Sequence, residues 1–301
     1  MALDVANREM YGKVAFGALV GIAGNLVLGG AKLAGGILGT SEALIADAVD
    51  TLSDSITSVV VLLGACQARR PADAEHPYGH GKAEVLAGRS VAVIVMLVGI
   101  LFGYRAITKI VSPGPQMPAL WTLWFALASI VVKEGMFQYK IRLGRRIKSE
   151  SLIADALNHR SDVFTSMFAA AGITAAIYLG AEWRFLDAIA AVVICLIIFG
   201  IGVAAFRRTS SALMDQAADA ETVDAIRRAA VGVEGVKDTE KLLTRRSGLE
   251  THVDLHVEVD PVMPVGDAHE IASAVDAAIR RDVPGVTHVT VHIEPYHPGD
   301  H

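Results

Sequence analysis

The sequence predicts a membrane α-helical bundle of six transmembrane helices, followed by a small C-terminal cytoplasmic α+β domain of βαβ-like order. The 301-residue chain is 52% hydrophobic with a mean hydropathy of +0.44, which is too apolar for a soluble chain of this length. The first two thirds contain several apolar runs near the ~20 residues that span a bilayer. The last third is charged and contains no such run.

Six apolar segments define the predicted membrane domain, residues 1–208. The breaks between them contain turn-forming residues, most clearly Ser112-Pro113-Gly114-Pro115. The polar N-terminus has no small-residue cleavage motif, so we do not expect a removable signal peptide. The predicted spans are residues 14–39, 43–66, 85–110, 120–139, 152–179 and 185–206.

Basic residues predict the orientation of the bundle. They cluster after the second, fourth and sixth spans, whereas the loops on the other side are nearly free of Lys and Arg. By the positive-inside rule both termini are cytoplasmic, and the short loops favour the cell (inner, cytoplasmic) membrane. The clusters are Arg69, Arg70 and Lys82; Lys140, Arg142, Arg145, Arg146 and Lys148; and Arg207 with Arg208.

Residues 209–301 form the predicted cytoplasmic domain. Residues 252–259 alternate between apolar and polar side chains, which predicts a strand. Helical spacing appears over residues 222–231 and 265–279, and further strands are expected at 236–244 and 286–293. This order predicts a small α+β domain with a βαβ-like core.

Composition excludes several classes of protein. A formal net charge of −5 and a pI of about 6.1 leave no basic footprint for nucleic acid. The two cysteines, Cys66 and Cys195, lie in apolar stretches, so we expect neither a disulfide nor a cysteine metal site. The chain also lacks a zincin motif, and we expect no enzyme activity.

The second and fifth spans contain similar motifs. Residues 46–54 (ADAVDTLSD) and 154–162 (ADALNHRSD) are identical at five of nine positions. Residues four apart lie on one face of a helix, so Asp50 and Asp54 share a face, as do Asn158 and Asp162.

Carboxylates inside a membrane helix cost roughly 2.5–3.5 kcal/mol each, so they normally face a cavity or a partner. If the two motifs face each other, three carboxylates and one amide oxygen form a four-ligand site for a divalent cation near mid-bilayer. The alternative is that these residues cap helix ends or pair with Lys32 and Arg160. Asp47, one turn earlier, is expected to support the ligands or cap a helix.

Two further clusters predict metal binding. Asp73, His76 and His80 lie in a loop bent by proline and glycine, and they suit a cation such as Zn²⁺ or Mn²⁺; the alternative is a polar turn with surface histidines. In the C-terminal domain, two strands and the helix between them contain His256, His269, His292 and Glu294. His292 and Glu294 share one face of their strand, and we expect the four side chains to form a metal site.

These motifs resemble those of the cation diffusion facilitator family of proton-coupled divalent-metal exporters. The resemblance includes SEALIADAVDTLSD in the second span, HPYGHGKAE in the following loop, ALNHRSD in the fifth span and LMDQAAD after the sixth. It implies a homodimer whose cytoplasmic domain binds metal at the subunit interface, and no prosthetic group. Family members often have His where this chain has Glu240. Lys82 and Asp215 match a salt bridge that acts as a hinge below the membrane domain.

The resemblance also implies a substrate. Asp50, Asp54, Asn158 and Asp162 match the family's transport site, and zinc-selective members commonly have His at the position of Asn158. An all-oxygen site favours Mn²⁺ or Fe²⁺ over Zn²⁺ or Co²⁺. His159 would need a rotation of about 100° about the helix to contribute a nitrogen, and we do not expect it to. Protons and metal would compete for the carboxylates. The alternative function is a metal-binding membrane scaffold or sensor that does not transport.

Overall fold

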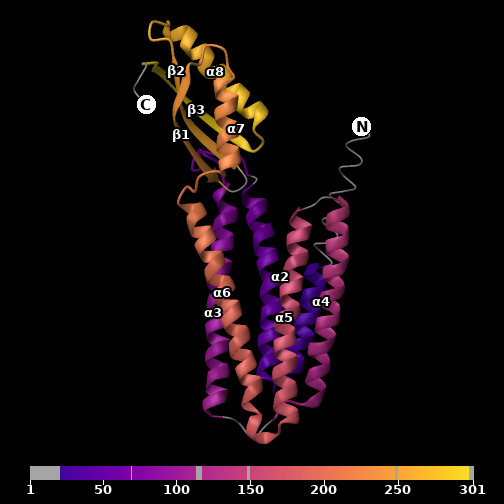
Figure 1. Cartoon of the computed structure of the whole chain (residues 1–301). Helices are drawn as coiled ribbons and strands as arrows, with labels where there is room; N and C mark the ends of the chain where they lie inside the picture. Colours follow the sequence, from indigo (N-terminus) through magenta and orange to yellow (C-terminus); the bar gives the residue numbers. More distant parts are fainter. Residues whose placement is uncertain (1–20, 69, 113–116, 148–149, 248–249, 298–301) are drawn as a thin grey trace. The chain divides into compact units, whose positions relative to one another are not determined.

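The computed structural model describes residues 21–68, 70–112, 117–147, 150–247 and 250–297 (Figure 1). Two compact units are present, one made from residues up to 60 and from 90–205, the other from residues 61–89 and from 206 onward. The division at 205/206 lies close to the expected boundary at 208/209, but residues 61–89 group with the C-terminal residues. The expected first span before residue 21, together with Arg69 and Lys148, lies outside the described residues.

The described residues include six long helices, which coincide with the six predicted spans. Each is separated from the next by a short connection, and the 3₁₀ turn η1 (Ala181–Trp183) precedes the last of them. The helices are Gly21–Leu38, α2 (Glu42–Ala68), α3 (Lys82–Val111), α4 (Leu120–Ile147), α5 (Glu150–Tyr178) and α6 (Phe185–Leu213).

Four of these helices are long and apolar enough to cross a membrane: Gly21–Leu38, Lys82–Val111, Leu120–Leu143 and Ala181–Leu213. α2 and α5 are not among these candidates in the part of the chain that the structure describes, so their crossing of the membrane remains a prediction. Every residue from Glu42 to Thr51 of α2 is buried, as is Ser41 just before the helix. The carboxylates of this segment therefore face protein, as charged groups in a membrane helix must.

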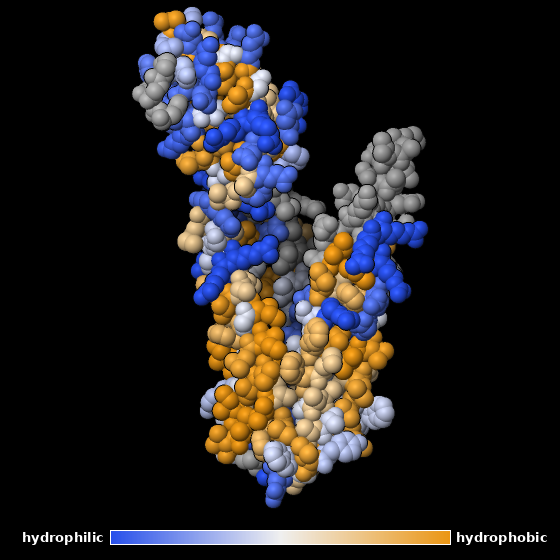
Figure 2. All heavy atoms as spheres, in the orientation of Figure 1, coloured by the Kyte–Doolittle hydropathy of each residue, from blue (hydrophilic) through white to orange (hydrophobic). Residues whose placement is uncertain are grey.

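The outer surface of the helices is hydrophobic. Large apolar side chains are exposed on α3, α4 and α6, including Leu101, Trp124 and Leu196. Figure 2 shows broad orange areas over the helical unit. An exposed apolar surface of this extent fits contact with lipid rather than water.

The N-terminal end of α2 is capped by a residue of α6. The Asp187 carboxylate accepts hydrogen bonds from the Ser41 hydroxyl at 2.7 Å and from the Glu42 N–H at 2.6 Å. The first N–H groups of a helix lack partners within the helix and favour a negative charge. Asp187 is itself buried, so this capping interaction is internal to the bundle.

The C-terminal domain contains a three-stranded sheet with two helices. Strand order is β1-β2-β3, with β1 and β2 antiparallel and β2 and β3 parallel. α8 connects the two parallel strands, so the predicted βαβ unit is confirmed. In chain order the elements are α7 (Ala220–Val231), β1 (Asp238–Ser247), β2 (Glu250–Val259), α8 (Val265–Asp282) and β3 (Val286–Pro295).

Strand alternation determines which face of the sheet remains open. Val253, Leu255 and Val257 are fully buried and belong to one apolar core with Val275 and Ile279 of α8. Side chains between them on β2 point to the other face, which α8 does not cover. That open face is where the polar residues of β2 and β3 lie.

Local signals explain the start of α7 and the turn that precedes β1. α7 begins after Asp219, whose carboxylate accepts a hydrogen bond from the Thr222 N–H at 2.9 Å, the usual role of an N-cap aspartate. Gly235 has a φ of 97°. A Cβ at this position would lie 2.5 Å from the Ile271 side chain, so the turn requires glycine.

Candidate metal sites

Three carboxylates converge inside the helical unit. Asp50 and Asp54 lie one turn apart on α2, and both interact electrostatically with Asp162 of α5. The Thr165 hydroxyl donates to Asp50 Oδ2 at 2.9 Å. Asp54 Oδ2 is buried and has no hydrogen-bond partner among the described residues. The structure thus brings together three of the four residues predicted for the intramembrane site.

The fourth predicted ligand, Asn158, is exposed, and its neighbour His159 is buried instead. His159 Nδ1 lies 3.7 Å from Asp162 Oδ2, and its Nε2 lies 2.8 Å from Lys140 Nζ. At 100° per residue, position 159 lies about 60° to one side of 162 and position 158 about 40° to the other. Both flank Asp162, so our expectation that only Asn158 faces the carboxylates is corrected by the packing of α5.

Sequence reasoning missed Lys133. This residue lies midway along α4, is fully buried, and places its Nζ 2.8 Å from Asp162 Oδ2. The signal was available, since an ionisable residue in the middle of a predicted span indicates a functional or paired group.

The predicted alternative partners, Lys32 and Arg160, do form ion pairs, but not with the proposed ligands. Lys32 pairs with Asp47 at 2.8 Å, which explains Asp47 as a structural residue. Arg160 pairs with Glu134 of α4. The intramembrane carboxylates Asp50, Asp54 and Asp162 are therefore not accounted for by these two basic residues.

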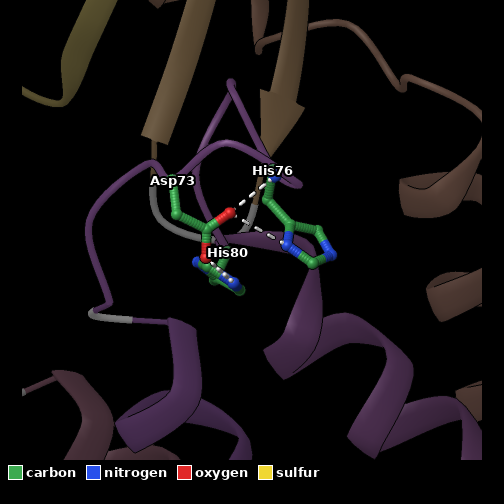
Figure 3. Close-up of side chains that lie close together, drawn as sticks. All are labelled: Asp73, His76 and His80. Carbon is green, nitrogen blue, oxygen red and sulfur yellow. Dashed lines mark hydrogen bonds and ion pairs between the residues drawn. The ribbon is translucent and has the colours of Figure 1, made fainter.

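The loop between α2 and α3 gathers Asp73, His76 and His80 (Figure 3). Asp73 lies 3.3 Å from His76 Nδ1 through one oxygen and 3.5 Å from His80 Nε2 through the other. One ligand atom from each of the three lies within 4.8 Å of the others. The backbone N–H groups of His76 and Glu75 donate to the carboxylate and hold the pKa of Asp73 below its ordinary value. This arrangement is suited to one borderline cation.

The same loop packs against the C-terminal domain within one compact unit. The Tyr78 ring lies 6.2 Å from the ring of His252, and the Arg245 guanidinium lies 5.2 Å from the Tyr78 ring. A Cβ on Gly81 would meet the Ser247 carbonyl oxygen at 2.5 Å, so backbone approaches backbone there.

Lys82 and Asp215 form the ion pair expected from the resemblance. Lys82 Nζ lies 2.9 Å from Asp215 Oδ1, and both side chains are about half exposed, at 43% and 48%. The Lys82 ammonium lowers the pKa of Asp215 below its ordinary value. A role as a hinge remains a prediction.

The open face of the sheet contains a second cluster of imidazole and carboxylate groups. His256 Nδ1 lies 2.8 Å from Glu294 Oε1, and His292 Nε2 lies 3.6 Å from the same oxygen. Glu240 of β1 completes a group whose ligand atoms with His256 and Glu294 lie within 4.8 Å. Glu240 therefore supplies a carboxylate to this face.

His269 does not join that cluster. It lies on α8, which packs on the opposite face of the sheet, and it lines a groove of about 470 Å³ whose edge includes Asp260 and Glu294. The expected convergence of His269 with His256 and His292 within one chain is therefore corrected. The reason is that a βαβ crossover places its helix on one face of the sheet, while alternation places the histidines on the other.

Comparison with known proteins accounts for both parts of the chain. Residues 18–214 match the family model described as the cation efflux transmembrane domain, and residues 218–296 match the cation efflux protein cytoplasmic domain. Solved structures of MamM-CTD are similar in sequence; one is 32% identical over 25% of this chain and 96% of its own, with a TM-score of 0.25.

Full-length relatives cover nearly the whole chain. The manganese efflux system protein MneP of Bacillus subtilis is 31% identical over 93% of this chain and 95% of its own length. MneS of the same organism is 33% identical, covering 93% and 94%. The magnetosome protein MamM of Magnetospirillum gryphiswaldense is 33% identical, covering 93% and 88%. On this evidence the chain belongs to the cation diffusion facilitator family and is a multi-pass membrane transporter for cation efflux, not an enzyme.

Proposed function

We propose that this transporter exchanges a divalent transition-metal cation for protons, with Mn²⁺ or Fe²⁺ preferred over Zn²⁺ or Co²⁺. The supporting observation is the convergence of Asp50, Asp54 and Asp162 inside the helical unit. Carboxylate oxygens suit manganese, whereas zinc sites usually include nitrogen or sulfur ligands.

Metal and protons compete for the same oxygens. A carboxylate binds metal only when ionised, so metal entry displaces protons, and a high proton concentration displaces metal. If the site opens alternately to the two sides of the membrane, a proton gradient drives metal outward. The names of MneP and MneS, two relatives that each match 93% of this chain, support manganese as a substrate.

His159 is the nearest imidazole to this site, and its proposed role is structural. Its Nε2 is engaged by Lys140 at 2.8 Å, while Nδ1 lies 3.7 Å from Asp162. We expect His159→Asn to keep the order of metal preference and to lower flux no more than about tenfold. A fall in zinc flux relative to manganese flux in this variant would instead identify His159 as a ligand.

The other two clusters are proposed as regulatory metal sites. Asp73, His76 and His80 would bind a cation in the loop, and Glu240, His256, His292 and Glu294 would bind one in the C-terminal domain. We place both termini in the cytoplasm of the cell and expect two chains to pair through the C-terminal domains. Metal at the domain then shifts the transporter toward the state that binds it better.

The test is metal flux in proteoliposomes under an imposed pH gradient, comparing Mn²⁺, Fe²⁺, Zn²⁺ and Co²⁺. We expect gradient-dependent flux, led by Mn²⁺ or Fe²⁺, that is lost in Asp54→Ala. The matched control is Asp267→Ala, which removes an exposed carboxylate from the first turn of α8 and should leave flux unchanged.

Other outcomes contradict separate parts of the proposal. Zinc leading would overturn the metal preference, and flux that ignores the pH gradient would overturn proton exchange. Absence of flux for every metal, in protein that still binds metal, would favour a metal-binding scaffold or sensor.

A further inference from the structure

We propose that Lys133 is a built-in competitor of the transported cation: its ammonium group offsets part of the negative charge of the carboxylate site between transport events, and metal binding displaces it from Asp162. This inference rests on the proposed function of Asp50, Asp54 and Asp162. It adds a residue from α4 to a site that the sequence assigns only to α2 and α5.

The position of Lys133 is the first argument. Its side chain is fully buried, and its Nζ lies 2.8 Å from Asp162 Oδ2. It also interacts electrostatically with Asp50 and Asp54. Among the described residues, Nζ makes no hydrogen bond to a hydroxyl or carbonyl group. The ammonium is therefore held by carboxylates: the three that are proposed to bind metal and, more weakly, Asp47.

A second buried lysine shows what a permanent pair looks like. Lys32 lies 2.8 Å from Asp47 and also donates to the Thr51 hydroxyl at 3.0 Å and the Ser166 hydroxyl at 3.2 Å. A lysine ammonium has three N–H donors, and all three of these contacts suit them. Removing Lys32 would leave the buried Asp47 carboxylate without its cation, whereas removing the Lys133 ammonium takes away a charge that a metal ion restores.

The charges also match. Three ionised carboxylates and one ammonium leave two net negative charges, which is the charge that a divalent cation neutralises. Uncompensated charge in a low-dielectric interior costs several kcal/mol, so negative charge that bound protons do not remove requires a cation. A divalent ion attracts a carboxylate about twice as strongly as an ammonium does at the same distance. The flexible four-carbon stem of lysine allows the ammonium to withdraw.

Competition has a measurable consequence, because a tethered cation weakens metal binding and speeds release. We would measure the Kd for Mn²⁺ in the purified full-length chain carrying Asp73→Ala and His256→Ala, so that binding reports the membrane site. In this background we expect Lys133→Met to bind Mn²⁺ at least about tenfold more tightly and to release it more slowly. Structural damage would weaken binding, so tighter binding distinguishes a competitor from a residue that only supports the fold.

Three variants complete the experiment. Lys133→Gln, a second neutral side chain, must change affinity in the same direction, and Lys133→Arg, which keeps the charge, should remain near the unmodified background. Lys32→Met removes the other buried ammonium and should not tighten binding. Equal or weaker Mn²⁺ binding in both neutral Lys133 variants overturns the inference.

Failure of the inference and failure of the proposed function are separable. In the same background, Asp54→Ala should abolish Mn²⁺ binding. If it does so while the Lys133 variants bind no more tightly, only the role of Lys133 is wrong. If Asp54→Ala binds Mn²⁺ normally, the carboxylates are not the site, and both proposals fail.

Discussion

The carboxylate site in the helical unit and the loop site around Asp73 place similar groups in opposite surroundings. Asp162 is 5% exposed and paired with a lysine, whereas the side chains of Asp73 and His76 are more than half exposed. Water stabilises the loop carboxylate, and its own backbone N–H groups orient it. In the interior, away from water, the Lys133 ammonium stabilises the Asp162 carboxylate instead. Burial thus makes one site depend on a partner cation, while the exposed site needs none.

The largest expected difference between the two sites is the loss of metal flux when one carboxylate is removed from each. Asp162→Asn leaves the buried Lys133 without its partner, which costs about 3–5 kcal/mol, so we expect metal flux to fall by at least about 100-fold. Asp73→Asn leaves a solvated loop with two histidines, and flux should stay within about threefold. Initial rates of Mn²⁺ uptake into proteoliposomes measure both, and near-normal flux in Asp162→Asn would contradict the comparison.

The pH dependence of the loop site is the next largest effect. The N–H groups of His76 and Glu75 lower the pKa of Asp73, so this carboxylate stays ionised well below neutral pH. Protons compete with a metal ion for the imidazole nitrogens of His76 and His80, because a metal binds only the neutral form of histidine. We therefore expect Zn²⁺ affinity at the loop to fall at least about tenfold between pH 7 and pH 5.

The pH dependence of Zn²⁺ binding at the loop is measured by calorimetry on the full chain carrying Asp54→Ala and His256→Ala, in which the other two sites are disrupted. Adding Asp73→Asn should weaken binding at every pH without changing the slope. His76→Asn should reduce the slope. A slope that follows Asp73 rather than the histidines would show that the loop carboxylate is not held in its ionised form.

The smallest expected effect concerns an exposed ion pair. Lys82 and Asp215 lie 2.9 Å apart but are about half exposed, and such pairs contribute at most about 1 kcal/mol. We expect Lys82→Gln to lower the thermal unfolding temperature only slightly, compared with the large loss for Lys32→Met at a fully buried pair. Equal losses in these two variants would show that the Lys82 pair is more than a surface contact.

Local patterns in the sequence were sufficient for much of this architecture. The helix-length apolar runs, the alternation in β2 and the paired motifs all depend on residues close together in the chain. They predicted the long helices, the βαβ unit and the convergence of Asp50, Asp54 and Asp162. Asp73, His76 and His80 were equally accessible to prediction, because eight residues of one loop bring them together.

Packing determined what the sequence pattern left open. Spacing along α5 allows either Asn158 or His159 beside Asp162, and only the rotation of the helix selects His159. The pairing of Lys133 depends on how α4 packs against α5. Glu240, and not His269, joins the C-terminal cluster because β1 pairs with β2 and brings Glu240 close to His256. The pairing of β1 with β2 cannot be read from the pattern of residues within either strand.

The Asp187 cap on α2 has a mechanical consequence. At this end of the bundle, α2 and α6 are joined by hydrogen bonds from Ser41 and Glu42 to one buried carboxylate. Separating the two helices there would strand a charge and the unpaired first turn of α2 away from water. When Asp50 and Asp54 are exposed first to one side of the membrane and then to the other, we therefore expect these two helix ends to move together as one rigid unit.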